Sequence, residues 1–287
     1  MLKKIIMGIL TLIIILCAIT GIYWQMNKET LRAEYTAFRK NSAPVLMYHG
    51  VGWENGPDWP RSLVITPTLF EAQLQYLTEQ GYHIVTVEEL AMRFTERKSV
   101  EKYIALSFDD GYKNNYTYAL PLLKKYQAKA SFFVVNKDIG SPIHMNEEEI
   151  KGLIKAGMEL GSHTMNHVPL TEIEDRYLAW ELSSSRYFLK KQFDRYIVRT
   201  IAYPNGRYNE HIIEEAQKYG FYRGLTGKIG VNTAQTYHDA PMAMYRVNIS
   251  DDGNGVQGFE ERLERAYLVG FLKSKGWDVN IIRDFLV

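Results

Sequence analysis

The sequence is short of cysteine and of net charge, and each shortage excludes a class of protein. Its one cysteine, Cys17, lies in an apolar run near the N-terminus, so the rest of the chain can form no disulfide. The formal net charge is +1 and the sequence has no basic stripe, which gives no electrostatic basis for binding nucleic acid. With 46% hydrophobic and 23% charged residues, the composition is that of an ordinary folded protein rather than a disordered one.

The N-terminus does contain a long uncharged run. Lys3 and Lys4 precede residues 5–26, which carry no charge and are long enough to cross a bilayer. The positive-inside rule places the lysines in the cytoplasm and the rest of the chain outside. A cleaved signal peptide is the alternative, but residues 22–24 are bulky where its cleavage site needs small side chains. We expect residues 1–26 to be an uncleaved single-pass anchor in the cell membrane; a cleaved segment would give a secreted protein.

Beyond a polar spacer, residues 27–42, short apolar runs alternate with helical patterns. In the segment 67–81, for example, Pro67 suits a first helical turn and Gly81 a helix end. Repeated strand-then-helix units predict parallel strands joined by helical crossovers. With seven or eight such units and no glycine-rich dinucleotide loop, the pattern favours an α/β fold of the (β/α) barrel type. We expect residues 43–287 to form this single domain.

Polar side chains follow four of the predicted strands. They are His49, the adjacent pair Asp109 and Asp110, His163, and the turn 204–206. The C-terminal ends of the strands form the active face of a (β/α) barrel, so these groups should meet at one rim. Two neighbouring carboxylates are costly to crowd together unless a positive charge offsets their repulsion.

His163 and His167 are four residues apart, and on a helical turn both imidazoles would point the same way. With one acid they make a three-ligand metal site with open positions. A divalent cation would offset the carboxylate repulsion, with Asp110 as ligand and Asp109 free as a base. Zinc is the default for two histidines and one aspartate, and cobalt, nickel or manganese would accept the same ligands.

Each motif taken singly has a plainer interpretation. DDG and PNG are common turns, and an HxxxH pair by itself is a weak signal. A lone His49 is more often a buried histidine with satisfied hydrogen bonds than a catalytic one. The joint placement of these residues after successive strands is what favours a functional site.

The motifs SFDDG, H-[ST]-x-x-H and a strand ending in YPNG resemble the polysaccharide deacetylases of carbohydrate esterase family four, the NodB-homology group. The resemblance covers most of residues 43–250, and YHGV after the first strand is similar to the poly-N-acetylglucosamine deacetylase branch. It implies metal-dependent hydrolysis of an N-acetyl amide, with Asp110, His163 and His167 as metal ligands.

The resemblance also implies the remaining catalytic roles. Asp109 matches the general base that takes a proton from the attacking water, and His49 matches the general acid that protonates the leaving amine. The backbone N–H of Asn205 matches the oxyanion donor.

The chain departs from the family pattern in its orienting residues. The arginine that the family places two residues before the proline is Ala202 here. We expect Arg246 to orient the catalytic aspartate in its place, with Arg199 as the alternative. For an acid that orients the general-acid histidine the candidates are Asp251 and Asp252, although both also suit a solvated turn.

Three aromatic residues are candidates for substrate binding. Trp53 and Trp59 lie in the loop 52–60 and could stack on a pyranose, although ordinary loop packing explains them equally well. Tyr112, just after the DDG motif, could line the same cleft or pack at the start of a helix.

We therefore expect an extracellular, membrane-anchored de-N-acetylase, on a Gram-positive surface, that acts on N-acetylglucosamine units of a biofilm-type exopolysaccharide. Alternative substrates are peptidoglycan or a sugar that links wall polysaccharide to it. Two further alternatives are an O-acetyl esterase that uses the same site and an inactive glycan-binding protein. The expected partners are the glycan and the membrane, with no nucleic acid and no protein partner predicted.

Overall fold

The computed structural model describes residues 25, 27–52, 63–194, 196–277 and 279. The chain divides into two compact units, Met1–Lys40 and Asn41–Val287. In the first unit the described residues 27–40 are helical. Among the described residues, no helix has both the length and the apolar character that a membrane span requires. The predicted span, residues 5–26, lies outside the described residues apart from Gln25.

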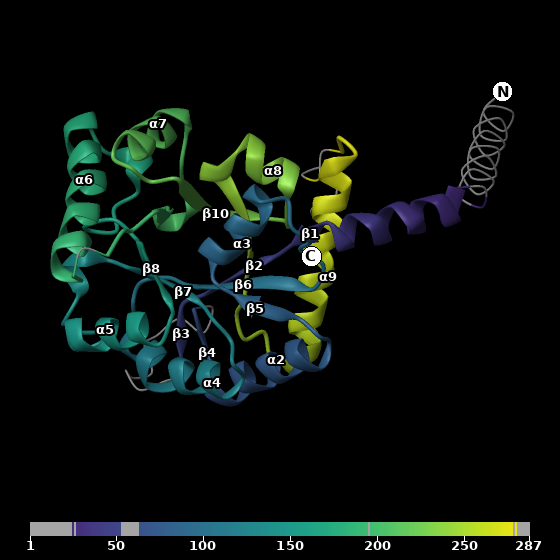
Figure 1. Ribbon diagram of the computed structural model, residues 1–287, viewed down its shortest axis with the longest axis horizontal. Helices are drawn as coiled ribbons and strands as arrows, with labels where there is room; N and C mark the ends of the chain where they lie inside the picture. Colours follow the sequence, from purple (N-terminus) through teal and green to yellow (C-terminus); the bar gives the residue numbers. More distant parts are fainter. Residues whose placement is uncertain (1–24, 26, 53–62, 195, 278, 280–287) are drawn as a thin grey trace, which may run out of the picture. The chain divides into compact units, whose positions relative to one another are not determined.

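Seven parallel strands of the second unit close into a barrel (Figure 1). In order around the ring they are β2 (Val45–Tyr48), β12 (Met244–Asn248), β10 (Arg223–Ile229), β9 (Thr200–Ala202), β8 (Glu159–Ser162), β7 (Ser131–Val134) and β6 (Tyr103–Phe108). The pairing of β6 with β2 closes the ring. The predicted (β/α) barrel of seven or eight strands is thus confirmed.

The eighth strand, β5 (His83–Val85), stands beside the ring rather than within it. It pairs with residues 103–105 of β6, whereas β7 pairs with residues 107–108 of the same strand. On this edge, β6 therefore pairs first with β5 and then with β7. Its second half, which ends directly before Asp109, is the part that pairs within the ring.

Helices connect the strands and lie outside the barrel (Figure 1). They are α2 (Pro67–Glu79), α3 (Val87–Thr95), α4 (Leu120–Lys125), α5 (Glu147–Lys155), α6 (Asp175–Gln192), α7 (Glu210–Lys218), α8 (Ala234–Asp239) and α9 (Gly255–Ser274). Local sequence sets several of their starts. The Thr66 side chain caps α2, and Asn146 and Glu149 form a reciprocal capping box at α5.

Two short pairs complete the sheet structure. β1 (Ser42–Ala43) pairs antiparallel with β11 (Asn232–Thr233), and β3 (Gly50–Val51) pairs in parallel with β4 (Val64–Ile65). A short π-helix, η1 (Asn115–Ala119), follows the DDG turn, and a single 3₁₀ turn, η4 (Pro204–Gly206), follows β9.

A stack of aromatic rings fixes the two strand ends that precede the predicted site. Tyr48 stacks on Phe108 at 5.2 Å, and Phe108 stacks on Phe132 at 4.9 Å. Phe70 of α2 meets the rings of Tyr48 and Phe108 edge-on. These rings pack toward the helix layer, and successive side chains of a strand point to opposite faces. The residue that follows each ring is therefore turned toward the interior of the barrel.

Candidate active site

The structure brings the predicted polar residues together at the C-terminal edge of the barrel. His49 follows β2 and Asp109 follows β6, and these two strands are neighbours. His163 follows β8, and Asn205 lies in the turn after β9. Since all the ring strands run parallel, their C-terminal ends form one rim.

Three of these side chains form a group that could hold a metal ion. The ligand atoms of Asp110, His163 and His167 all lie within 4.8 Å of one another. The Nε2 atoms of His163 and His167 lie 3.4 Å and 3.5 Å from Oδ1 of Asp110. Nδ1 of His163 lies 2.8 Å from the backbone oxygen of Ala202, so Nδ1 carries the proton and donates it. This bond leaves the lone pair of Nε2 facing Asp110, as a metal ligand requires.

The backbone of the DDG turn aims the Asp110 carboxylate. Asp110 and Gly111 both adopt left-handed conformations, with φ of 70° and 77°. Aspartate tolerates this region better than most residues, and a Cβ on Gly111 would lie 3.0 Å from Cγ1 of Val134. The DDG motif is thus both a turn and part of the site, because the turn geometry sets the direction of the carboxylate.

The histidine pair is not on a helical turn, so that expectation was wrong. The segment between β8 and α6 is irregular there, and Thr164 and His167 are left-handed with φ of 69° and 58°. The backbone N–H of His167 donates to Oγ1 of Thr164 at 3.1 Å. The two imidazole rings still converge, with centroids 4.6 Å apart, but a strained loop brings them together rather than helical periodicity.

A buried acid from α6 holds this loop in place. Oε2 of Glu181 accepts hydrogen bonds from the backbone N–H groups of Met165 and Asn166, both at 2.9 Å. Oε1 accepts a third, from the side-chain amide of Asn166, at 2.7 Å. Glu181 is only 3% exposed, so these bonds are shielded from water. No local spacing in the sequence pointed to this residue.

Asp109 is paired with a buried arginine. Nη1 of Arg246 donates to Oδ1 of Asp109 at 2.8 Å, and Nε donates to the backbone oxygen of Thr226 at 2.8 Å. Burial alone would raise the pKa of Asp109, but the guanidinium of Arg246, followed by the neighbouring histidines, outweighs it and holds the pKa below its usual range. Arg199, the other candidate, instead pairs with Glu88 at 2.9 Å.

His49 faces the same carboxylates, but no acid orients it in the described structure. Burial is the main cause of its lowered pKa, which the charges of Asp109 and Asp110 only partly oppose. Nδ1 of His49 is buried without a hydrogen-bond partner among the described residues. The two acids proposed to orient His49 have other partners. Asp252 pairs with Arg262 at 3.0 Å, and Asp251 accepts a hydrogen bond from the backbone N–H of Gly253.

The turn after β9 presents backbone groups at the rim. Asn205 is exposed and left-handed, with φ of 56°, and Gly206 follows with φ of 66°. A Cβ on Gly206 would lie 2.4 Å from the backbone nitrogen of Gly227, so the two strand ends pack backbone against backbone. This approach fixes the position of the turn, and the oxyanion role of Asn205 stays a prediction.

Of the three predicted aromatic contacts, the structure places Tyr112 in the site. Its hydroxyl donates to Asp110, and burial followed by the charge of Asp110 raises the pKa of Tyr112. Its ring stacks on His144 at 5.0 Å, a histidine that no motif in the sequence indicated. Trp53 and Trp59 lie outside the described residues.

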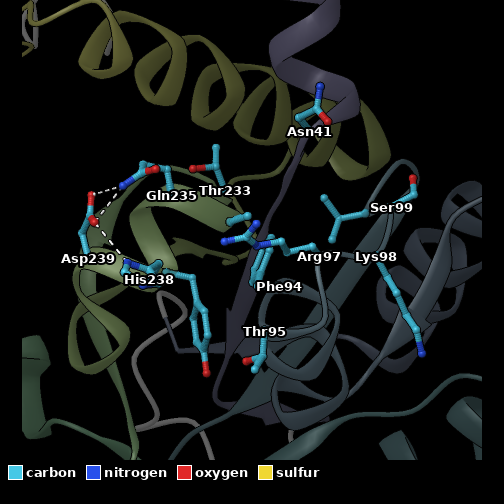
Figure 2. A pocket seen from close by; sticks show the side chains of 13 residues that line it. Asn41, Phe94, Thr95, Arg97, Lys98, Ser99, Thr233, Gln235, His238 and Asp239 are labelled. Carbon is cyan, nitrogen blue, oxygen red and sulfur yellow. Dashed lines mark hydrogen bonds and ion pairs between the residues drawn. The ribbon is translucent and has the colours of Figure 1, made fainter.

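A separate groove of about 780 Å³ lies on the same unit (Figure 2). Residues 94–100, at the end of α3 and just after it, face residues 233–239 there, and the rings of Phe94 and Tyr237 stack at 5.5 Å. Because residues 94–100 precede β6, this groove lies at the N-terminal edge of the barrel. Its lining includes none of the predicted site residues.

Comparison with known proteins agrees with the family resemblance of the sequence motifs. A family model described as polysaccharide deacetylase matches residues 96–224. YxkH of Bacillus subtilis, which carries the polysaccharide deacetylase name, is 34% identical over 213 residues, covering 74% of this chain and 73% of its own. The poly-β-1,6-N-acetyl-D-glucosamine N-deacetylase of Staphylococcus aureus strain N315 is 26% identical and covers 92% of this chain and 96% of its own.

A solved structure agrees with these sequence matches. The Streptococcus pyogenes deacetylase PplD, in complex with acetate, matches with a TM-score of 0.68 and 27% identity. The match covers 77% of this chain and 98% of PplD. The chain belongs to the polysaccharide deacetylase family and is a hydrolase that acts on N-acetyl amide bonds.

Proposed function

We propose that this protein removes acetyl groups from N-acetylglucosamine units of a β-1,6-linked surface polysaccharide, in a metal-dependent reaction that leaves a free amine. The observation that carries the proposal is the pairing of an Asp-His-His group with the buried, arginine-bound Asp109 at one rim. The S. aureus relative, which is named for this substrate, matches almost the whole chain and supports the choice of polymer.

The donor set fits a divalent cation. Burial alone would raise the pKa of Asp110, but the neighbouring histidines outweigh it and hold the pKa well below its usual range, so Asp110 supplies an anionic oxygen. His163 supplies Nε2, because its Nδ1 donates to the Ala202 carbonyl. His167 supplies the third atom, and zinc is the default for such a set. A bound cation would polarise the acetyl carbonyl and make water easier to deprotonate near neutral pH.

The other residues are placed to move protons. Arg246 engages Oδ1 of Asp109 and keeps that group ionised, so its second oxygen can take a proton from the attacking water. An amine leaves poorly unless it is protonated, and His49, facing the same carboxylates, would supply that proton. The exposed turn at Asn205 would present a backbone donor to the developing oxyanion.

We place the catalytic unit outside the cell, anchored by the N-terminal run. The uncharged residues 5–26 follow two lysines, which the positive-inside rule places in the cytoplasm. Topology is tested by protease protection of the full chain in intact cells. Digestion of the catalytic unit from outside supports the proposal, and protection until lysis contradicts it.

The deciding experiment measures acetate release by the full chain in detergent. The metal is stripped, and oligomers of β-1,6-N-acetylglucosamine are supplied with and without Zn²⁺, beside Asp109→Asn. We expect release that needs the metal and that the substitution lowers about 10²–10⁴-fold, the range for loss of a general base. Chitin and peptidoglycan fragments rank the polymer, and no release from any of the three would reject the proposal.

A parallel assay distinguishes amide hydrolysis from ester hydrolysis as the activity of this protein. An alkoxide leaves more readily than an amine, so protonation by His49 matters less for an O-acetyl ester. We expect His49→Asn to slow amide hydrolysis strongly while any ester hydrolysis falls much less. Equal rates for the variant and the parent on N-acetyl oligomers would remove His49 from the acid role.

A further inference from the structure

A second groove, of about 540 Å³, lies beside the metal-ligand loop. One wall is the stretch on either side of His167, and the other is the start of α6. The apolar side chains that line it are Val168, Ile173, Tyr177 and Trp180. In a βα unit the helix begins near the C-terminal end of the preceding strand, so the first turns of α6 lie at the rim where the site is.

The groove and the metal centre share one piece of backbone. Asn166 and Val168, which line the groove, are the immediate neighbours of His167. Glu181 binds the loop from the helix side and also lines the groove. A ligand in the groove would therefore touch the same segment of backbone that positions a metal ligand.

Two aromatic rings in this groove are exposed to an unusual degree. Tyr177 is 51% exposed and Trp180 is 45% exposed, and their spacing of three residues puts them on one face of α6. Clustered exposed aromatic side chains at a groove commonly mark a binding surface. Aromatic faces of this kind give a flat apolar surface on which the C–H face of a sugar ring can stack.

The polar groups at the groove do not suit an anionic ligand. Nε of Arg176 pairs with Glu174 at 3.0 Å, and its guanidinium lies 4.6 Å from the centre of the Tyr177 ring. The amide of Asn166 already donates to Glu181. The two charged residues of the lining, Arg176 and Glu181, are thus already engaged by other groups, and the remaining lining is mainly stacking surface, which fits an uncharged pyranose better than a phosphate or a carboxylate.

We propose that this groove is a glycan subsite, in which Trp180 and Tyr177 stack on a sugar ring at least two units removed from the residue that loses its acetyl group. The inference rests on the proposed function and deepens it, because it makes the enzyme sensitive to chain length. Binding energy from a remote ring helps to hold the reacting unit in place, so a longer oligomer is the better substrate.

The test compares short and long oligomers in matched variants. Trp180→Ala removes the ring in the groove, Trp180→Phe keeps an aromatic face, and Tyr187→Ala removes an aromatic that is 66% exposed on the same helix but outside the groove. For each, kcat/KM is measured on the dimer and the hexamer of β-1,6-N-acetylglucosamine. We expect the hexamer-to-dimer ratio to fall about 3- to 10-fold for Trp180→Ala. Most of the ratio should return in Trp180→Phe, and Tyr187→Ala should match the parent.

An unchanged ratio in Trp180→Ala, or an equal fall in Tyr187→Ala, would overturn the subsite. Binding of the hexamer to Asp109→Asn and to its double variant with Trp180→Ala, measured by calorimetry, gives a readout that needs no turnover. Weaker binding of the hexamer by the double variant supports the subsite even where the parent releases no acetate. A parent that releases no acetate rejects the proposed function but not the subsite. Light scattering that shows a parent dimer and a Trp180→Ala monomer would assign the groove to self-association and reject the subsite.

Discussion

Two buried carboxylates at opposite ends of the barrel have pKa values that are shifted in opposite directions. Asp109, at the end of β6, is 2% exposed, and its pKa is lowered because Arg246 and His163 outweigh burial. Glu159, at the start of β8, is 6% exposed, and burial raises its pKa. The same cost of burial is therefore overcome at one end of the barrel and not at the other.

The difference lies in the partners. Glu159 accepts hydrogen bonds from Oγ of Ser131 at 2.6 Å, from Oγ1 of Thr200 at 2.8 Å and from the backbone N–H of Glu88 at 2.8 Å. All three donors are neutral, and the nearby Arg223 lies 3.2 Å from the carboxylate of Glu88. Neutral donors order a carboxylate, whereas a directly bonded guanidinium also keeps it charged.

The carboxylates at the two ends of the barrel thus suit different roles. Glu159 ties β7, β9 and α3 together with both of its oxygens engaged. Asp109 has its Oδ1 engaged by Arg246. A carboxylate kept ionised at the open rim can accept protons, which agrees with the rule that chemistry sits at the C-terminal face and structural roles at the other.

The difference between Asp109 and Glu159 should depend most on the guanidinium of Arg246, which the substitution Arg246→Met removes. An unpaired buried charge costs about 3–5 kcal/mol, so urea unfolding should show a loss of that order. The pKa of Asp109 should rise, because burial is then less opposed, and the carboxyl ¹³C shift measures it. Asp109→Asn in the same chain should recover much of the stability. Arg199→Met is the control, since that arginine pairs with Glu88 in a partly exposed position. A similar loss in both arginine variants would contradict the special role of Arg246.

Stabilisation by metal should depend on the ligands at the rim where Asp109 lies and not on Glu159. A ligand that binds the folded state at about 100 times its Kd adds about 2.7 kcal/mol to stability. We expect Zn²⁺ to raise the Tm of the metal-stripped parent by several degrees, to raise that of Glu159→Gln equally, and to leave His167→Ala little changed. Scanning calorimetry with a chelator control measures this. An equal rise in His167→Ala would place the metal elsewhere.

Much of this site could be predicted from the sequence because its residues follow recognisable strands. His49, Asp109 and His163 each come directly after a predicted strand, and strand order alone brings such positions to one rim. Arg246 could be proposed for the same reason, since it lies on the late strand β12, which neighbours β2 in the ring.

Other contacts could not be predicted, because they depend on distant packing. Glu181 binds the metal-ligand loop from a helix, and His144 meets Tyr112 across a loop, and neither contact has a local spacing that marks it. The left-handed conformation of Thr164 runs against the preference of a β-branched residue, so the sequence suggested a helical turn instead. Strand β5 was visible as an apolar run, but its place beside the ring rather than in it was not.

The smallest expected effect, and the finest test of the contrast, concerns the direction of pH dependence. Because the folded-state pKa of Glu159 is raised, its carboxylate costs stability above that pKa, and the cost disappears as pH falls toward about 4.3. Asp109 has a lowered pKa, so it contributes stability above about 3.9 that is lost as pH falls further. Glu159→Gln should differ from the parent by about 1 kcal/mol at pH 7, the worth of one altered hydrogen bond.

On acidification the two variants should then diverge. Glu159→Gln should lose ground relative to the parent between neutral pH and pH 4, because only the parent gains stability by taking up a proton there. Asp109→Asn should gain ground on the parent below pH 4, where the parent loses the contribution of its ionised carboxylate. Urea midpoints measured across this range give both slopes. Slopes of the same sign would mean that the two carboxylates share one electrostatic environment, and that the arginine does not set the rim apart.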